Sequence, residues 1–113
     1  MSESDEAKGP PPFDQNLADS YIGKYVLIGV THLNHAGEMV RRRQIHGVIT
    51  SATPKGIIVT LKGASEGTSW TMPPALEAIS IAKPGSYSLK ETGETVTDPD
   101  LLSTWTITEP QKH

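Results

Sequence analysis

The sequence predicts an all-β domain, and the preferred architecture is a small antiparallel barrel of the SH3-like type with five or six strands and one short 3₁₀ turn. Composition is the first reason: 35% of residues are hydrophobic and only 20% charged, with ten glycines and nine prolines, a balance typical of short strands joined by turns. The second is that no segment has the apolar period of a long amphipathic helix. Short strands leave unpaired edges unless the sheet closes, which favours a barrel. An OB-like barrel and a small sandwich are the alternatives.

The chain divides into a tail and one domain. Residues 1–18 are rich in acids, serine and proline, and they contain few large apolar groups. A segment of that kind buries too little apolar area to offset the entropy of ordering, so we expect a disordered acidic, Pro-rich tail. We expect a single barrel domain over 19–109, which is enough chain for one hydrophobic core, and a free C-terminus over 110–113.

Two predicted strands open the domain. The first lies within "YIGKYVLIGVTHL" (21–33), where apolar residues fall on both alternating faces, so we expect burial on both sides. One face carries Val26, Ile28 and Val30, and the other carries Tyr25, Leu27 and Leu33. The second strand is "MVRRRQIHGVITS" (39–51), in which Gly47 is a plausible bend.

The remaining elements are short. Strands are predicted over 56–63 and 68–72, and they are antiparallel to their neighbours in sequence because the connecting loops are brief. Pro73-Pro74 ends this run, and "ALEAI" predicts one turn of 3₁₀ helix. Further short strands are "SYSLK" (86–90), "TVT" (95–97) and "STWTIT" (103–108).

The segment "THLNHAGE" (31–38) contains two histidines and a carboxylate at regular spacing, but it also has the residues of a hairpin loop. Asn34 and Gly37 tolerate positive φ angles, so a four-residue loop that pairs Leu33 with Glu38 is expected. A five-residue loop is the alternative. Neither register lets His32 and His46 share a metal ion, because they lie either on opposite faces or about 20 Å apart.

Catalysis and cofactors are not expected. The chain has no cysteine, which excludes thiolate zinc sites and a cysteine nucleophile. It also lacks a nucleophile elbow and a phosphate-cradling glycine loop. The remote alternative is a metal-assisted enzyme that uses His32, His35 and Glu38. No catalytic residue is assigned.

Arg41, Arg42 and Arg43 form the single dense basic cluster of the sequence. We expect a hairpin arm over 31–43 to present these arginines, with His35 at its tip, to an unidentified protein partner. A small nucleic-acid-binding barrel that uses the same arginines is the alternative. It is less favoured, because residues 17–113 hold nine acids and nine bases, whereas nucleic-acid binders carry a basic excess. A solvated face, or pairing with the acids between Glu91 and Asp100, would explain the cluster without any binding role.

The N-terminus is acidic where a signal peptide is basic, and no apolar run reaches membrane-spanning length, so a cytoplasmic protein without membrane contact is expected. The segments "GKYVLIGVT", "QIHG", "MPP", "PGSY", "TGE" and "DPDLLSTWTI" resemble a family of small bacterial proteins with an SH3-like β-barrel and no known activity. The resemblance spans residues 22–108. It implies a bacterial source and an intact single domain, and it carries no site residue to this chain.

Overall fold

The computed structural model of the chain describes residues 13–110, and within them the protein is mostly β. Residues 1–12 of the expected tail and residues 111–113 at the C-terminus lie outside the described range. The described elements are α2 (Gln15–Tyr21), β1 (Tyr25–Leu33), β2 (Met39–Thr53), β3 (Gly56–Leu61), the 3₁₀ turn η1 (Gly63–Ser65), β4 (Ser69–Met72), the 3₁₀ turn η2 (Leu76–Ala78), β5 (Ile79–Ile81), β6 (Ser86–Ser88), β7 (Thr95–Thr97) and β8 (Leu101–Thr108).

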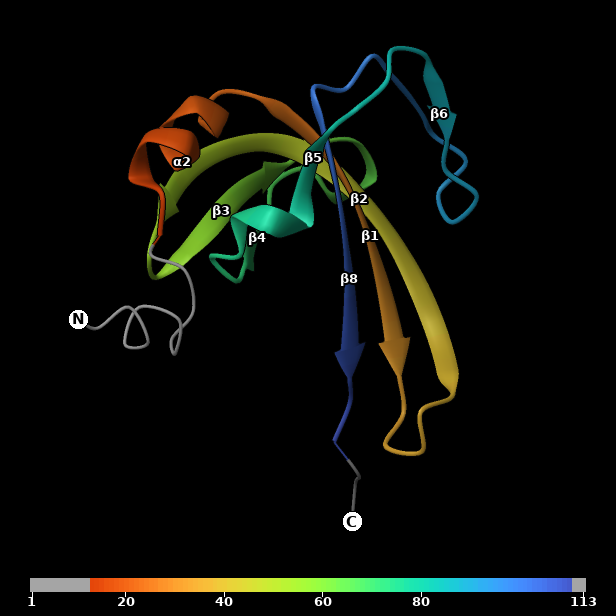
Figure 1. Cartoon of the computed structure of the whole chain (residues 1–113). Helices are drawn as coiled ribbons and strands as arrows, with labels where there is room; N and C mark the ends of the chain where they lie inside the picture. The colour runs from red at the N-terminus through yellow and green to blue at the C-terminus, as the bar shows by residue number, and fades with distance from the viewer. Residues whose placement is uncertain (1–12, 111–113) are drawn as a thin grey trace, which may run out of the picture.

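Six strands form one sheet in the order β4-β3-β2-β1-β8-β5, and β6 and β7 form a separate hairpin. Strands β1 to β4 are joined in antiparallel pairs, as predicted. The last long strand, β8, instead lies beside β1 in parallel (Figure 1). The sheet therefore ends at β4 on one side and at β5 on the other. Because it is not closed, the expected closed barrel is wrong. Docking of β8 on the free side of β1 widens the sheet instead of closing it.

Hydrophobic side chains pack on both faces of the sheet, because β1 alternates two apolar sets. The main core gathers thirteen buried residues around Val26, Ile28 and Val30, and it includes Met72 from β4. On the other face a smaller cluster forms where the β6–β7 hairpin covers Leu27. The two-sided burial predicted for the first strand is therefore confirmed.

Strand β2 is long because it belongs to two parts of the sheet. Its first part pairs with β1, and β3 begins to pair only at Gly47. A Cβ atom at Gly47 would overlap the carbonyl oxygen of Thr60 on β3. Glycine is therefore required where β3 approaches the backbone of β2.

The first four residues of helix α2, 15–18, lie in the segment expected to be part of the tail. Asp14 caps it by accepting a hydrogen bond from the N–H of Leu17 at 3.0 Å, which satisfies one free donor of the first turn. Ala18 is completely buried in the main core, and Phe13 packs against it. The expected tail over 1–18 thus extends too far, since its last residues form a helix that covers the core.

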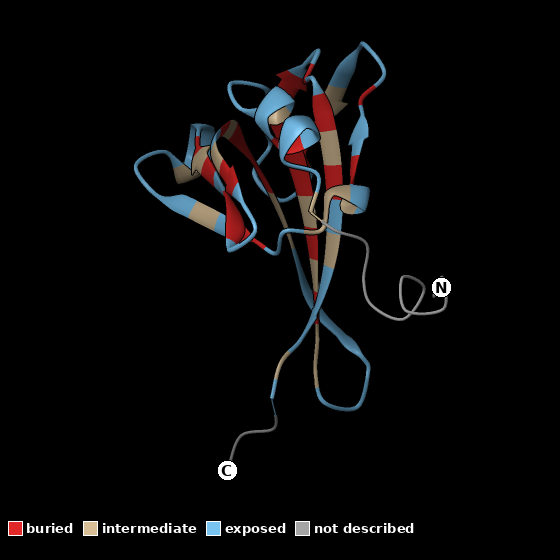
Figure 2. Cartoon of the chain, turned by 60° about the vertical axis from the view of Figure 1, so that its left-hand side comes forward, coloured by how far each residue is buried: buried red, intermediate tan, exposed pale blue. Residues whose placement is uncertain are grey.

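Three strands continue beyond the packed body as an arm (Figure 1). Strand β5 pairs with β8 only as far as Ser103, and β3 pairs with β2 only from Gly47 onward. We define the arm as residues 29–33 of β1, 39–45 of β2 and 104–108 of β8, together with the loop over 34–38. At its base Val30 and Ile45 still pack in the main core. Buried positions gather in the body, whereas the far end of the arm is mostly exposed (Figure 2).

Candidate functional site

The loop at the end of the arm contains five residues. Asn34 and Glu38 close it through the backbone, with the N–H of Asn34 donating to the carbonyl of Glu38 at 2.8 Å. The side-chain oxygen of Asn34 accepts from the N–H groups of Ala36 and Glu38, and Gly37 adopts a φ of +86°. Gly37 has the positive φ predicted for it, whereas Asn34 does not and shapes the loop through its side chain instead. The four-residue loop is replaced by its longer alternative.

A bulge follows the loop and shifts the strand register once more. Leu33 faces Met39, but His32 faces Arg41, so β2 contains one extra residue between these pairs. The extra loop residue and the bulge together move the register by two positions from the preferred prediction. Because side chains alternate with a period of two, the predicted faces are preserved.

The arginines lie on the free side of the arm. Arg41 and Arg42 are exposed and Arg43 is half-buried. Within residues 13–110 none of the three forms an ion pair, so the structure does not show the alternative in which acids of this chain neutralise them. Met39 and Val40, directly before them, are 60% and 49% exposed. The tip of the arm thus combines cationic and apolar side chains in open solvent.

The histidines predicted as remote metal ligands do not converge. His32 is buried, and its Nδ1 lies 3.3 Å from Oε2 of Glu109, although the geometry does not satisfy a hydrogen bond. His35 is exposed in the loop, and Glu38 accepts from the side-chain amide of Asn34. Among the described residues no group of three or more acids and histidines is placed to hold a metal ion.

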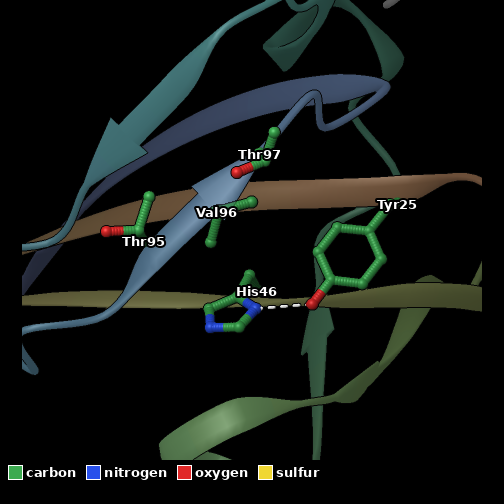
Figure 3. Close-up of a pocket in the computed structure, with 5 residues that line it drawn as sticks. All are labelled: Tyr25, His46, Thr95, Val96 and Thr97. Carbon is green, nitrogen blue, oxygen red and sulfur yellow. Dashed lines mark hydrogen bonds between the residues drawn. The ribbon is translucent and has the colours of Figure 1, made fainter.

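A polar network not anticipated from the sequence lies on the face of the sheet that carries the smaller cluster, opposite the main core. The hydroxyl of Tyr25 on β1 is 2.6 Å from Nδ1 of His46 on β2 (Figure 3). The other ring nitrogen, Nε2, is 3.2 Å from Oε1 of Glu94, which lies in the loop before β7. When Tyr25 donates to Nδ1, the ring carries its proton on Nε2 and donates to Glu94.

Glu94 is the acceptor at the end of this network. It also accepts from the hydroxyl of Thr92 at 2.9 Å and from the N–H of Ala64 at 2.8 Å. The hydrogen bonds from Thr92 and His46 hold the pKa of Glu94 below its ordinary value, because they stabilise the carboxylate. The network therefore ties η1, β2 and the β6–β7 hairpin together.

The same network borders a small hollow of about 210 Å³, lined by Tyr25, His46, Thr95, Val96 and Thr97 (Figure 3). Burial, and next the charge of Glu94, raise the pKa of Tyr25 above its ordinary value. A raised pKa keeps the phenol protonated at neutral pH, which is the reverse of what an activated nucleophile requires. We therefore interpret the hydroxyl as a hydrogen-bond donor that orients His46.

The four-residue loop expected from the sequence would pair Tyr25 with His46, but the sequence did not identify Glu94, because that residue lies 48 positions beyond His46. The one local signal is Gly63, which has a φ of +66°. A Cβ atom there would overlap Oε2 of Glu94 and would lie 2.8 Å from Nε2 of His46. A glycine two residues after the end of β3 therefore marks the place where the carboxylate approaches.

Comparison with known proteins gave no match: no protein family, curated protein or solved structure matches this chain significantly. The resemblance to small bacterial proteins therefore remains an expectation. In the part of the chain that the structure describes, no helix has both the length and the apolar character needed to span a membrane.

Proposed function

We propose that this protein is a non-catalytic protein-binding module of a bacterial cytoplasm and that the tip of the arm contacts the partner. The observation that carries the proposal is the adjacency of Arg41 and Arg42, exposed and without an ion pair in the described part of the chain, to Met39 and Val40. We call these four residues the tip surface. Arg41 and Arg42 point to opposite faces of the strand, and both side chains are exposed.

The chemistry of the tip surface favours a protein partner. Methionine and arginine are enriched at protein interfaces, where apolar contact and directed hydrogen bonds are made side by side. The guanidinium groups of Arg41 and Arg42 suit carboxylates, which they bind through two parallel hydrogen bonds. A partner with acidic groups around an apolar patch would complement this surface.

Nucleic acid is the less favoured occupant. Residues 17–113 have equal numbers of acids and bases, whereas phosphate binding draws on an excess of positive charge. Trp70 and Trp105 pack against the main core and Tyr87 packs in the smaller cluster. None of these three rings is a free platform on which bases would stack.

The experiment is recovery of the native partner with wild-type protein and with a double variant, Arg41→Ser with Arg42→Ser. The control variant, Lys83→Ser with Lys90→Ser, removes the same charge from exposed positions outside the arm. Nuclease treatment before recovery separates proteins from nucleic acid. We expect one protein, resistant to nuclease, to be lost only from the arginine variant. Recovery of the same proteins with all three forms, or of nuclease-sensitive material alone, would overturn the proposal.

A further inference from the structure

Part of β8 is an open sheet edge. Strand β5 pairs with residues 101–103, and no strand within residues 13–110 pairs with 104–108 on that side. In Figure 1 this part of β8 forms the outer side of the arm. Backbone donors and acceptors along this side are therefore available to another strand.

The pairing of β8 with its neighbours identifies these groups. The N–H of Glu109 donates to the carbonyl of Leu33 on β1, and successive residues of a strand direct their backbone groups to alternate sides. The backbone N–H and C=O groups of Trp105 and Ile107 therefore point toward β1. The N–H and C=O groups of Thr104, Thr106 and Thr108 face outward, and the side chains of these threonines are exposed.

In the described part of the chain, the free edge of β2 is protected against the addition of another strand, whereas the 104–108 edge of β8 is not. The free side of β2 carries Arg41, Arg42 and Arg43, and charged side chains on an edge oppose the addition of a strand. Along 104–108 of β8 every residue is uncharged, and all except Trp105 are β-branched. These are the residue types that favour strand pairing.

We propose that the 104–108 edge of β8 pairs in antiparallel fashion with the same edge of a second copy of this chain. The sequence "TWTIT" is self-complementary about its centre. A two-fold axis at Thr106 sets the Thr106 residues of the two copies face to face, where they exchange backbone hydrogen bonds. The same axis sets Thr104 opposite Thr108 and places Trp105 opposite Ile107, which is 38% exposed in the single chain.

The length of the open edge fits this register. With Thr106 opposite Thr106, Glu109 comes level with Ser103 of the second copy, which is where β5 begins to pair. Pro110 follows directly, has no N–H group to donate, and ends the strand at that point. The paired segment therefore stops before it would meet β5 of the other copy.

Dimerisation through β8 is independent of partner binding at the tip surface. The test begins with the molar mass of the full chain in solution over a range of concentrations. We expect wild-type protein, and the variant with Arg41→Ser and Arg42→Ser, to reach twice the mass of one chain. A monomer at every concentration, or a series of larger species, would overturn the inference.

Substitutions that place a charge at the two-fold axis then test the register of the two paired β8 strands. Thr106→Lys and Thr106→Asp should each be monomeric, because like charges directly opposite one another repel. An equimolar mixture should form a dimer that contains one chain of each kind. Retention of the dimer by either variant alone, or failure of the mixture to pair, would show that β8 does not join the two copies.

Hydrogen exchange provides a second readout that does not depend on substitution. In the dimer the amides of Thr104, Thr106 and Thr108 should be protected, and dilution to the monomer should raise their exchange rates at least tenfold. Those of Trp105 and Ile107 should be protected in both states, because they bond to β1. Equal exchange of the threonine amides at low and high concentration would contradict the pairing.

Discussion

The hydroxyl of Tyr25 lies 2.6 Å from Nδ1 of His46, across two neighbouring strands of the sheet. Because the other nitrogen of the same ring lies 3.2 Å from Glu94, a single imidazole connects the sheet to the loop of the β6–β7 hairpin. Buried polar groups stabilise a fold only when each is satisfied. The network therefore holds the smaller cluster in place, and it can be tested without knowledge of any partner.

Tyr25→Phe removes the donor to Nδ1 of a buried histidine. We expect the free energy of unfolding to fall by about 1 to 2 kcal/mol, because a ring nitrogen of a mostly buried histidine loses its hydrogen-bond partner. Tyr87→Phe is the control, since its hydroxyl donates to the carbonyl of Lys83 at an exposed site where water replaces it. Urea unfolding of both variants measures the difference, and equal losses would contradict a specific role for Tyr25.

Gly63→Ala should be more destabilising than Gly67→Ala. Both glycines have positive φ angles, +66° and +99°, so both substitutions strain the backbone by about 1 kcal/mol. At Gly63 the new methyl group also displaces Glu94 from His46, whereas at Gly67 nothing lies within 4 Å. We expect an additional loss for Gly63→Ala in urea unfolding, because the hydrogen bond between His46 and Glu94 is broken. Similar losses at the two positions would show that the network contributes little.

The lowered pKa of Glu94 predicts how the free energy of unfolding depends on acid pH. Its pKa is lower in the folded protein than its ordinary value of 4.5, first because of the hydrogen bond from Thr92 and next because of that from His46. The stability it contributes is therefore present above pH 4.5 and is lost as pH falls through the lowered folded value.

Glu94→Gln tests this dependence directly. The variant should be less stable than wild type at neutral pH, and the difference should shrink below pH 4.5, as measured by urea unfolding across the pH range. The exposed Glu66→Gln is the control for loss of one negative charge. A constant difference between Glu94→Gln and wild type at all pH values would contradict the assignment.

Local patterns in the sequence predicted the faces of the strands but not their arrangement. Alternation in the first strand predicted two buried faces, and Asn34 with Gly37 predicted the hairpin. The register of that hairpin was wrong by two positions, yet the faces of His32 and His46 were correct, because two shifts of one residue restore the alternation.

The features that were missed depend on contacts between distant segments. Nothing in the strand Leu101–Thr108 by itself indicates that it lies parallel to β1, so the closed barrel was favoured over the open sheet. The short helix Gln15–Tyr21 is difficult to recognise, because Ala18 is its one buried residue. Glu94 reaches His46 only after the β6–β7 hairpin has folded over the sheet.

Arg41→Ser with Arg42→Ser should leave the fold intact. Both side chains are exposed, and neither forms an ion pair within the described residues, so the free energy of unfolding should change by less than about 0.5 kcal/mol. Thermal and urea unfolding check this. A larger loss would show that the arginines stabilise the arm, and their loss would then not report on partner binding alone.

The measurement that tests the binding proposal most directly is site-specific photo-crosslinking in the native cell. A photoreactive residue replaces Met39, which is 60% exposed at the tip of the arm, or Ile81, which is 84% exposed on β5 outside the arm. We expect a discrete protein adduct from position 39 that disappears when Arg41 and Arg42 are replaced by serine, and no such adduct from position 81. Identical adducts from both positions, or none from position 39, would contradict the binding proposal.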